Sequence, residues 1–203
     1  MNQKETEDRS IRAFAARLGL STAPGGGLPV HGVLDGVALS ISKVNRGQSR
    51  YPWPVTQFLA TAPTEIPGGV VAYKPNFRWR FQGERKIADS LGSTGLFGFV
   101  HHDPVGDPEL DKKLVIYADD VPLARELLTA KEVKAAILAA LALAGHIRIH
   151  ESRVAVELSE RRRGVLRLLA SAEEVEAFAR AATDVARALT AASSAFRTGA
   201  PIS

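Results

Sequence analysis

Histidine and aspartate residues gather in one stretch of the sequence, "GFVHHDPVGDPELDKKLVIY" at positions 98–117. Imidazole and carboxylate groups are ligands for several divalent metal ions. A site here would draw on His101, His102, Asp103, Asp107 and Asp111. The two histidines converge on one ion only if the loop bends sharply, because neighbouring residues of an extended chain point to opposite faces. One hypothesis for the protein is therefore a metal-dependent enzyme.

Local structure offers a second explanation of the same stretch. Asp107 is placed to cap a single helical turn that has Pro108 at its first position. Asp103 followed by Pro104 indicates an extended approach to the loop. The helical His-x-x-x-His spacing and the Ca²⁺-loop spacing are both missing. We therefore expect a loop, a capped turn and a strand over "KLVIYA".

Arginine and aromatic residues alternate in "YKPNFRWRFQGERK" at positions 73–86. Guanidinium and ammonium groups bind phosphates, and an aromatic ring stacks on a base or contacts a partner. The residues for such a site are Arg78, Trp79, Arg80, Arg85 and Lys86, joined by a second basic run at Arg161, Arg162 and Arg163. A strand over the same segment would instead bury Phe77, Trp79 and Phe81 and leave the arginines as a solvated face. A core strand, a protein interface and a nucleic-acid or other polyanion site all remain open.

Other patterns give little support for catalysis. His146 and His150 lie about 13 Å apart if they share a strand, so they cannot bind one metal ion. The loop "GSTG" at positions 92–95 is neither a nucleophile elbow nor a phosphate-binding loop. We expect no cofactor and, on balance, no enzyme.

Composition bounds the class of protein. The 203 residues are 45% hydrophobic and 24% charged, which is ordinary for one globular domain. The net charge of +4 is a mild excess rather than the strong bias of a dedicated nucleic-acid binder. Cysteine is absent, which excludes disulfides, thiolate metal ligands and cysteine nucleophiles. No stretch has the length of a membrane span or the pattern of a signal peptide, so we expect a cytoplasmic protein.

The N-terminal part predicts a helix followed by strands. Apolar spacing predicts an amphipathic helix over residues 1–19, and "STAPGGGLP" predicts a hinge without regular structure at residues 20–28. Asp35-Gly36 lies between two alternating runs and indicates a hairpin turn. Further strands are expected at 55–61 and 69–74.

The C-terminal part predicts helices around one more hairpin. Asp119 and Asp120 can cap a helix that ends near Leu128, and "TAKE" at 129–132 has the spacing of a capping box for the next. "HIRIH" and "RVAVEL" alternate as a hairpin. "SAEE" at 171–174 is a second capping box, before a long apolar stripe.

The segment "GDPELDKKLVIYADDVPLARELLT" at 106–129 resembles an uncharacterised family of bacterial domains. That family has the pattern Gly-Asp-Pro-x-(Phe/Leu)-Asp, then a strand, an acidic turn and a helix ending Leu-Leu-Thr. The likeness extends to "ARLGL" and "GVLDGVALSI" upstream, and to the hairpin and last helix downstream. Leu110 stands where the pattern usually has Phe. The resemblance implies a single domain and supplies no activity.

These patterns together predict an α+β fold: a mostly antiparallel sheet of about six to eight strands, covered on one face by helices that include a long C-terminal one. The single domain should span 29–197, followed by a flexible tail at 198–203. The expected function is a non-catalytic protein-interaction or scaffold module, with a protein partner or self-association. The alternatives are nucleic-acid or polyanion binding through the basic segment, and a metal-dependent enzyme.

Overall fold

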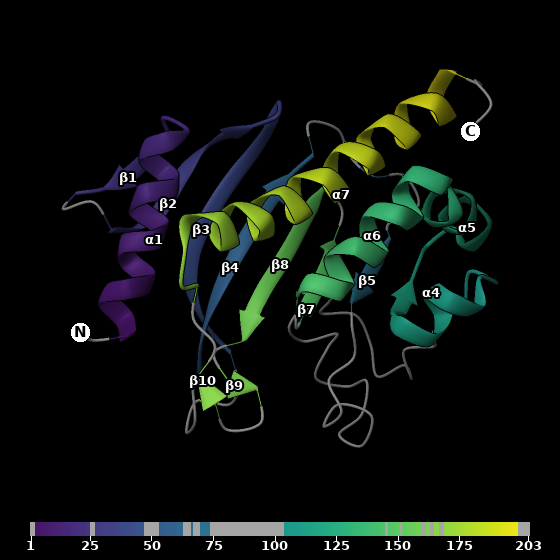
Figure 1. Ribbon diagram of the computed structural model, residues 1–203. Helices are drawn as coiled ribbons and strands as arrows, with labels where there is room; N and C mark the ends of the chain where they lie inside the picture. Colours follow the sequence, from purple (N-terminus) through teal and green to yellow (C-terminus); the bar gives the residue numbers. More distant parts are fainter. Residues whose placement is uncertain are drawn as a thin grey trace.

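The computed structural model describes residues 3–24, 27–46, 53–62, 66, 70–73, 104–144, 146–150, 152–159, 161–162, 165–166 and 169–198. Over these residues the chain has the predicted α+β fold, with an antiparallel sheet and helices packed on one of its faces (Figure 1).

The main sheet has eight strands in the order β1-β2-β3-β4-β8-β7-β5-β6, and every neighbouring pair is antiparallel. The strands are β1 (Ser21–Ala23), β2 (Gly27–Leu34), β3 (Val37–Arg46), β4 (Trp53–Thr61), β5 (Val71–Tyr73), β6 (Val115–Tyr117), β7 (His146–His150) and β8 (Arg153–Ser159). A separate small sheet pairs β9 (Arg161–Arg162) with β10 (Val165–Leu166).

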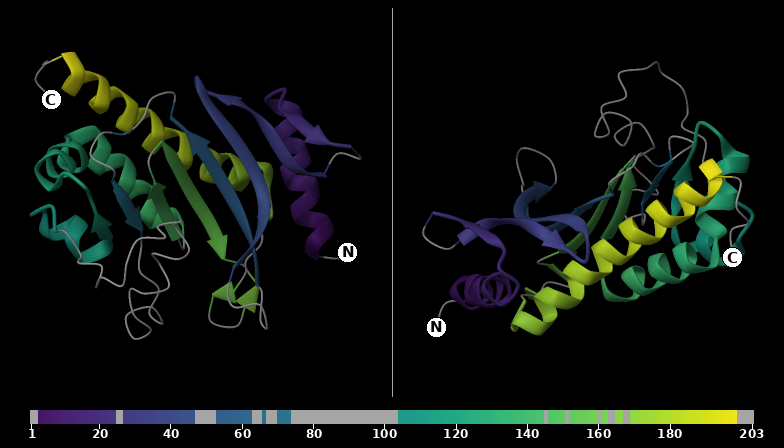
Figure 2. Two further views of the ribbon diagram at one scale, coloured as in Figure 1. Left: turned by 180° about the vertical axis from the view of Figure 1, so that it is seen from behind. Right: turned by 90° about the horizontal axis from the view of Figure 1, so that it is seen from above.

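The described helices lie mainly on one side of the sheet in the view from above (Figure 2). They are α1 (Gln3–Arg17), α4 (Pro108–Lys113), α5 (Val121–Thr129), α6 (Lys131–Leu143) and α7 (Ala172–Thr198). Helix α7 crosses β3, β4 and β8, while α1 lies beside β1 and β2. Helices α4 to α6 lie towards the β5 and β6 end of the sheet (Figure 1).

The core forms between α7 and the middle strands. The predicted stripe of α7 is buried, from Val175 and Phe178 to Leu189. The rings of Phe58 on β4 and Phe178 stack with their centroids 5.5 Å apart. The alternating residues predicted for the β7–β8 hairpin, such as Ile149 and Val154, are buried in the same core. The periodicity of the sequence therefore identified this core correctly.

Turn and capping signals were confirmed with one exception. Asp35 and Gly36 have φ angles of 50° and 79° in the turn between β2 and β3, the left-handed conformation that a two-residue hairpin needs. Asp120 caps α5 by accepting a hydrogen bond from the Leu123 amide at 2.9 Å. The capping box at 129–132 is wrong, because α6 begins after Ala130 without a side-chain cap and the Thr129 hydroxyl donates to the Arg125 carbonyl instead.

The N-terminal helix forms as predicted, but the segment after it is more regular than expected. Residues 21–23 form β1 and residue 27 begins β2, so the prediction that 20–28 lacks regular structure is wrong at these positions. Leu20 packs over Gly32 of β2, where a Cβ atom would lie 2.4 Å from Leu20 Cδ2. The short strand forms because β2 offers a free edge beside it. The proposed division into helix, hinge, domain and tail stays a prediction.

Candidate functional site

The basic residues predicted as a site are mostly outside the described residues. This applies to Arg78, Trp79, Arg80, Arg85, Lys86 and Arg163. Arg161 and Arg162 lie in β9, paired with β10 in the small sheet. Polyanion binding through these residues therefore stays a prediction.

The histidine and aspartate residues predicted as metal ligands are only partly within the described residues. His101, His102 and Asp103 are outside the described residues. Asp107 and Asp111 are described, and both bind neighbouring backbone. The Asp111 carboxylate accepts hydrogen bonds from the amides of Val105 and Gly106, each at 3.0 Å. Its two oxygens therefore hold the loop that precedes α4.

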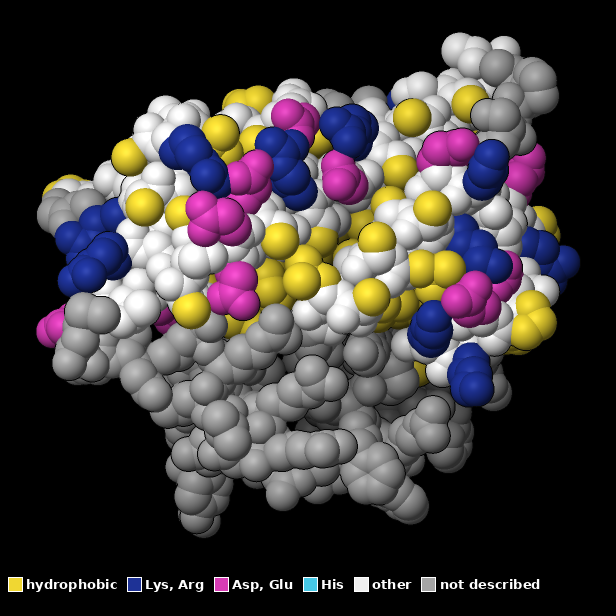
Figure 3. Space-filling model, in the orientation of Figure 1, with side chains coloured by type: hydrophobic (Ala, Val, Ile, Leu, Met, Phe, Trp, Pro, Cys, Tyr) yellow, Lys and Arg dark blue, Asp and Glu magenta, His cyan; other side chains and the backbone are white. Residues whose placement is uncertain are grey.

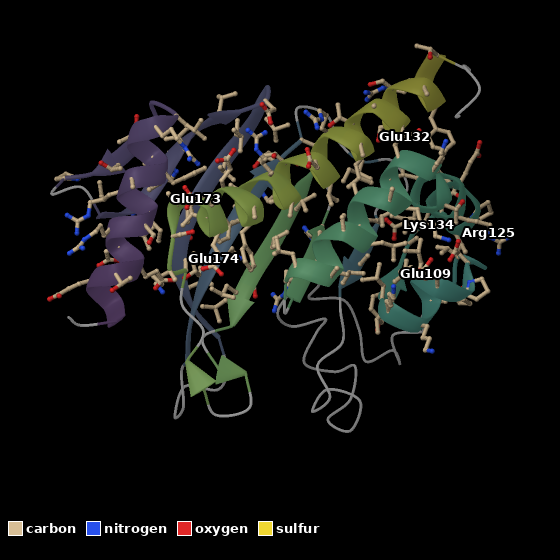
Figure 4. All side chains as sticks on the ribbon, in the orientation of Figure 1. Glu109, Arg125, Glu132, Lys134, Glu173 and Glu174 are labelled. Atoms are coloured by element: carbon tan, nitrogen blue, oxygen red, sulfur yellow. The ribbon has the colours of Figure 1, made fainter. Side chains whose placement is uncertain are left out.

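Asp107 caps α4 as predicted and also forms an ion pair. Its Oδ1 accepts from the amides of Glu109 and Leu110, while its Oδ2 lies 2.6 Å from Lys134 Nζ. The hydrogen bond from Lys134 lowers the pKa of Asp107, and the two amides lower this pKa further. Asp107 in turn raises the pKa of Lys134. Figure 4 shows Glu109 and Lys134 together at the contact between α4 and α6.

This cluster joins the elements around the α4 loop. Lys134 also lies 3.6 Å from Glu109, which pairs with Lys113 at 2.9 Å. Within the described part of the chain, no group of three or more His, Cys, Asp and Glu side chains is placed to hold a metal ion. The cluster has a structural explanation, and the metal hypothesis stays a prediction that depends on His101 and His102.

A different feature appears on the sheet face that points away from the helices. Side chains of β2, β3 and β4 alternate, and one set of each faces the core while the other faces outward. We call nine described side chains of the outward set the uncharged face: His31, Val33, Ala38, Ser40, Ser42, Val44, Gln57, Leu59 and Thr61. Val55, opposite Val44, belongs to the same side of the sheet and is 1% exposed. The next outward position of β3 is Arg46, whose side chain is outside the described ones. None of the nine is Asp, Glu, Lys or Arg.

Strand register brings this set together. His31 pairs with Ser40, and Ser40 pairs with Leu59, so the three residues form one row across the sheet. Val33 is 64% exposed and is the most prominent apolar side chain on the surface of the described residues. The other members of the uncharged face are exposed or partly exposed. The result is a patch of small, apolar and hydrogen-bonding side chains.

The helix-covered side of the molecule has the opposite character. Figure 3 shows Lys and Arg side chains interleaved with Asp and Glu over that surface. Next to β4 on the outward sheet face, β8 has two described charged residues, exposed Arg153 and buried Glu157. The Gln57 amide donates to Glu157 Oε1 at 2.9 Å, which ties the border of the uncharged face to the neighbouring strand.

Sequence reasoning did not find the uncharged face. Each strand shows only its own alternation, and small polar residues such as Ser40 and Ser42 carry no motif. The signal that could have revealed it is the absence of charge at alternate positions of three consecutive predicted strands. Solvent-facing positions of an antiparallel sheet are commonly polar or charged, so this absence is informative.

Comparison with known proteins adds no further constraint. No family model, curated protein or solved structure matches the chain. Among the helices of the described residues, none combines the length and the apolar character needed to cross a bilayer.

Proposed function

We propose that the protein is a non-catalytic interaction module of a bacterial cytoplasmic assembly, and that it binds a protein partner through the uncharged face. The observation that supports this proposal is that the nine described side chains of the uncharged face, on three adjacent strands, include no charged group, on a sheet face that the described helices leave uncovered. The partner is a protein surface of similar neutral character.

Charge depletion favours a protein partner for a physical reason. The centre of a protein–protein interface loses its water, and a charged side chain there must find a matched partner or suffer desolvation. Serine, glutamine and threonine hydrogen-bond across an interface without that penalty. A polyanion would instead require Lys or Arg at the contact, and the uncharged face has neither.

The test places one negative charge on the face. Val33→Asp introduces a carboxylate at a residue that is 64% exposed, so folding should change by less than about 0.5 kcal/mol. The matched control is Ala177→Asp, at an exposed position of α7 on the helix-covered side. The full chain serves as bait in the native host, captured proteins are identified by mass spectrometry, and self-association is measured as molar mass in solution.

The expected result is a partner, or a second copy of this chain, that binds the wild type and Ala177→Asp and is lost with Val33→Asp. Binding should weaken at least about tenfold, because a lone carboxylate is left desolvated in the contact. Capture that survives Val33→Asp unchanged would refute the assignment of this face. So would the absence of any specific capture together with a monomeric mass.

A further inference from the structure

One side chain of the uncharged face can gain a charge by taking up a proton. His31 is an exposed residue of β2, and it is the only titratable residue among the nine side chains of the face. Histidine is the side chain whose charge ordinarily changes between pH 5 and 8. Protonation of this one imidazole therefore converts a neutral set of side chains into a set with one positive charge.

Strand register surrounds His31 with neutral groups. It pairs with Ser21 of β1 on one side and with Ser40 of β3 on the other, and Leu59 of β4 continues the same row. Val33, two positions further along β2, is 64% exposed. None of these four side chains can form an ion pair with an imidazolium group.

The described charged residues around this row are either paired or distant. Asp35, in the turn that follows β2, forms an ion pair with Arg180 of α7 at 2.8 Å. Arg153 and Glu157 belong to β8, three strands away from β2, or about 14 Å at the usual strand spacing. Arg46, whose side chain is outside the described ones, ends β3 about 20 Å along the strand from this row.

Helix α1 also packs on β2, but from the helix-covered side of the sheet. Its Glu7 carboxylate lies 2.5 Å from Lys43 Nζ of β3 and accepts a hydrogen bond at 2.9 Å from the hydroxyl of Thr56 on β4. Lys43 and Thr56 pair with each other across β3 and β4 and face the helices. The sheet therefore lies between these charges and His31.

We propose that His31 makes binding at the uncharged face depend on pH, so that protonation of its imidazole releases the neutral protein partner; this rests on the proposed function of the face. A neutral imidazole offers one hydrogen-bond donor and one acceptor to a neutral partner. An imidazolium group has two donors and a charge, and burying that charge against neutral groups costs desolvation without a compensating ion pair. Binding therefore requires the unprotonated form and weakens as the pH falls.

The affinity of the full chain at two pH values tests this role. The probe is the protein that the wild type captures and Val33→Asp does not, or a second copy of the chain if Val33→Asp abolishes self-association. The dissociation constant should rise about tenfold from pH 7.5 to pH 5.5, as expected when one histidine that titrates in this range must be unprotonated to bind.

Substitutions at the same exposed position separate charge from contact. His31→Gln keeps a neutral donor and acceptor, so its dissociation constant should be the same at both pH values. His31→Lys has a permanent charge and should bind about tenfold more weakly than the wild type already at pH 7.5. The matched control is His150→Gln on β7, outside the uncharged face, which should keep the pH dependence of the wild type.

The role of His31 is refuted if the wild type binds equally at both pH values or more tightly at pH 5.5, or if His31→Gln keeps the loss at pH 5.5. The proposed function is untouched by those results, because it depends on the effect of Val33→Asp at pH 7.5. If Val33→Asp changes neither capture nor self-association at pH 7.5, the proposed function fails, and the role of His31 fails with it.

Discussion

Helices α1 and α7 cover the same face of one sheet, but different groups hold them there. Helix α7 buries an apolar stripe that extends from Val175 to Leu189 and includes the Phe178 ring. Helix α1 buries a shorter apolar stripe and, one turn before it, the carboxylate of Glu7. The apolar contact of α7 is strong and tolerates many sequences, whereas the polar contact of α1 is selective and costs desolvation.

Stability and specificity therefore depend on different side chains in this fold. Truncating an apolar side chain under α7 removes buried area and leaves a cavity in the common core. Changing Glu7 or its partners alters a polar contact beside that core, to which Ile11, Phe14 and Ala15 of α1 also belong. Substitutions under α7, at the helix caps and at the contact between α1 and α7 should distinguish these contributions.

Phe178→Ala should destabilise the whole domain. Phe178 is 1% exposed and stacks on Phe58, so its loss leaves a large cavity between α7 and β4. We expect the free energy of unfolding to fall by about 3–5 kcal/mol. Urea unfolding followed by far-UV circular dichroism and by tryptophan fluorescence measures it. The two signals should shift together, and separate transitions would show that α7 is not part of one cooperative core.

Ser171→Ala should have a smaller effect that is specific to α7. The Ser171 hydroxyl accepts from the Glu174 amide at 3.2 Å, and the Glu174 carboxylate accepts from the Ala170 amide at 2.7 Å. Removing the hydroxyl should cost about 1 kcal/mol in urea unfolding.

Thr129→Ala is the matched control at the other capping-box sequence. Its hydroxyl donates to the Arg125 carbonyl within α5 and does not cap α6, so the cost should stay below about 0.5 kcal/mol. Equal losses for Ser171→Ala and Thr129→Ala would contradict the assignment of one true cap and one false one.

The smallest effect should be a change in how the stability of the protein depends on pH. It arises at the contact between α1 and α7. The Glu176 carboxylate binds Arg180 on its own helix at 2.8 Å and also Arg17 of α1. The hydrogen bond from Arg180 lowers the pKa of Glu176 from its ordinary value of 4.5, and Arg17 adds to the lowering. This carboxylate therefore contributes stability above pH 4.5 that is lost as the pH falls through the folded-state pKa.

Glu176→Gln should remove that contribution. Melting temperatures from pH 7 down to pH 2 are expected to fall less steeply below pH 4.5 in the variant than in the wild type. Because the pKa of Glu173 on the same helix is also lowered, only the difference between the two curves is informative. Identical slopes would show that the contact between Arg17 and Glu176 contributes nothing measurable.

Much of the fold could be predicted because its signals are local. The turn at Asp35 and Gly36, the cap at Asp107 and the stripe of α7 each depend on residues within a few positions of one another. The capping box at Thr129 failed because the hydroxyl found a carbonyl one turn back in α5, a competing partner that the motif does not contain.

The candidate site could not be predicted, because it depends on strand register. Ser40 and Leu59 become neighbours only when β3 pairs with β4, and Gln57 meets Glu157 only when β4 pairs with β8. The role of Glu7 was hidden for a similar reason, since its partners Lys43 and Thr56 belong to strands distant in the sequence. The available sign in the sequence was Glu7 itself, a charged residue on the same helical stripe as Ile11 and Phe14.

The place of β4 in the sheet matters during synthesis. Strands β1 to β4 are consecutive and can pair as the chain emerges from the ribosome, but β8, which completes the other edge of β4, follows about a hundred residues later. Until then the nascent chain exposes an apolar strand with unpaired backbone groups, a template for wrong pairing with another chain. The interval between translation of β4 and β8 is therefore a period in which this edge is open to wrong pairing.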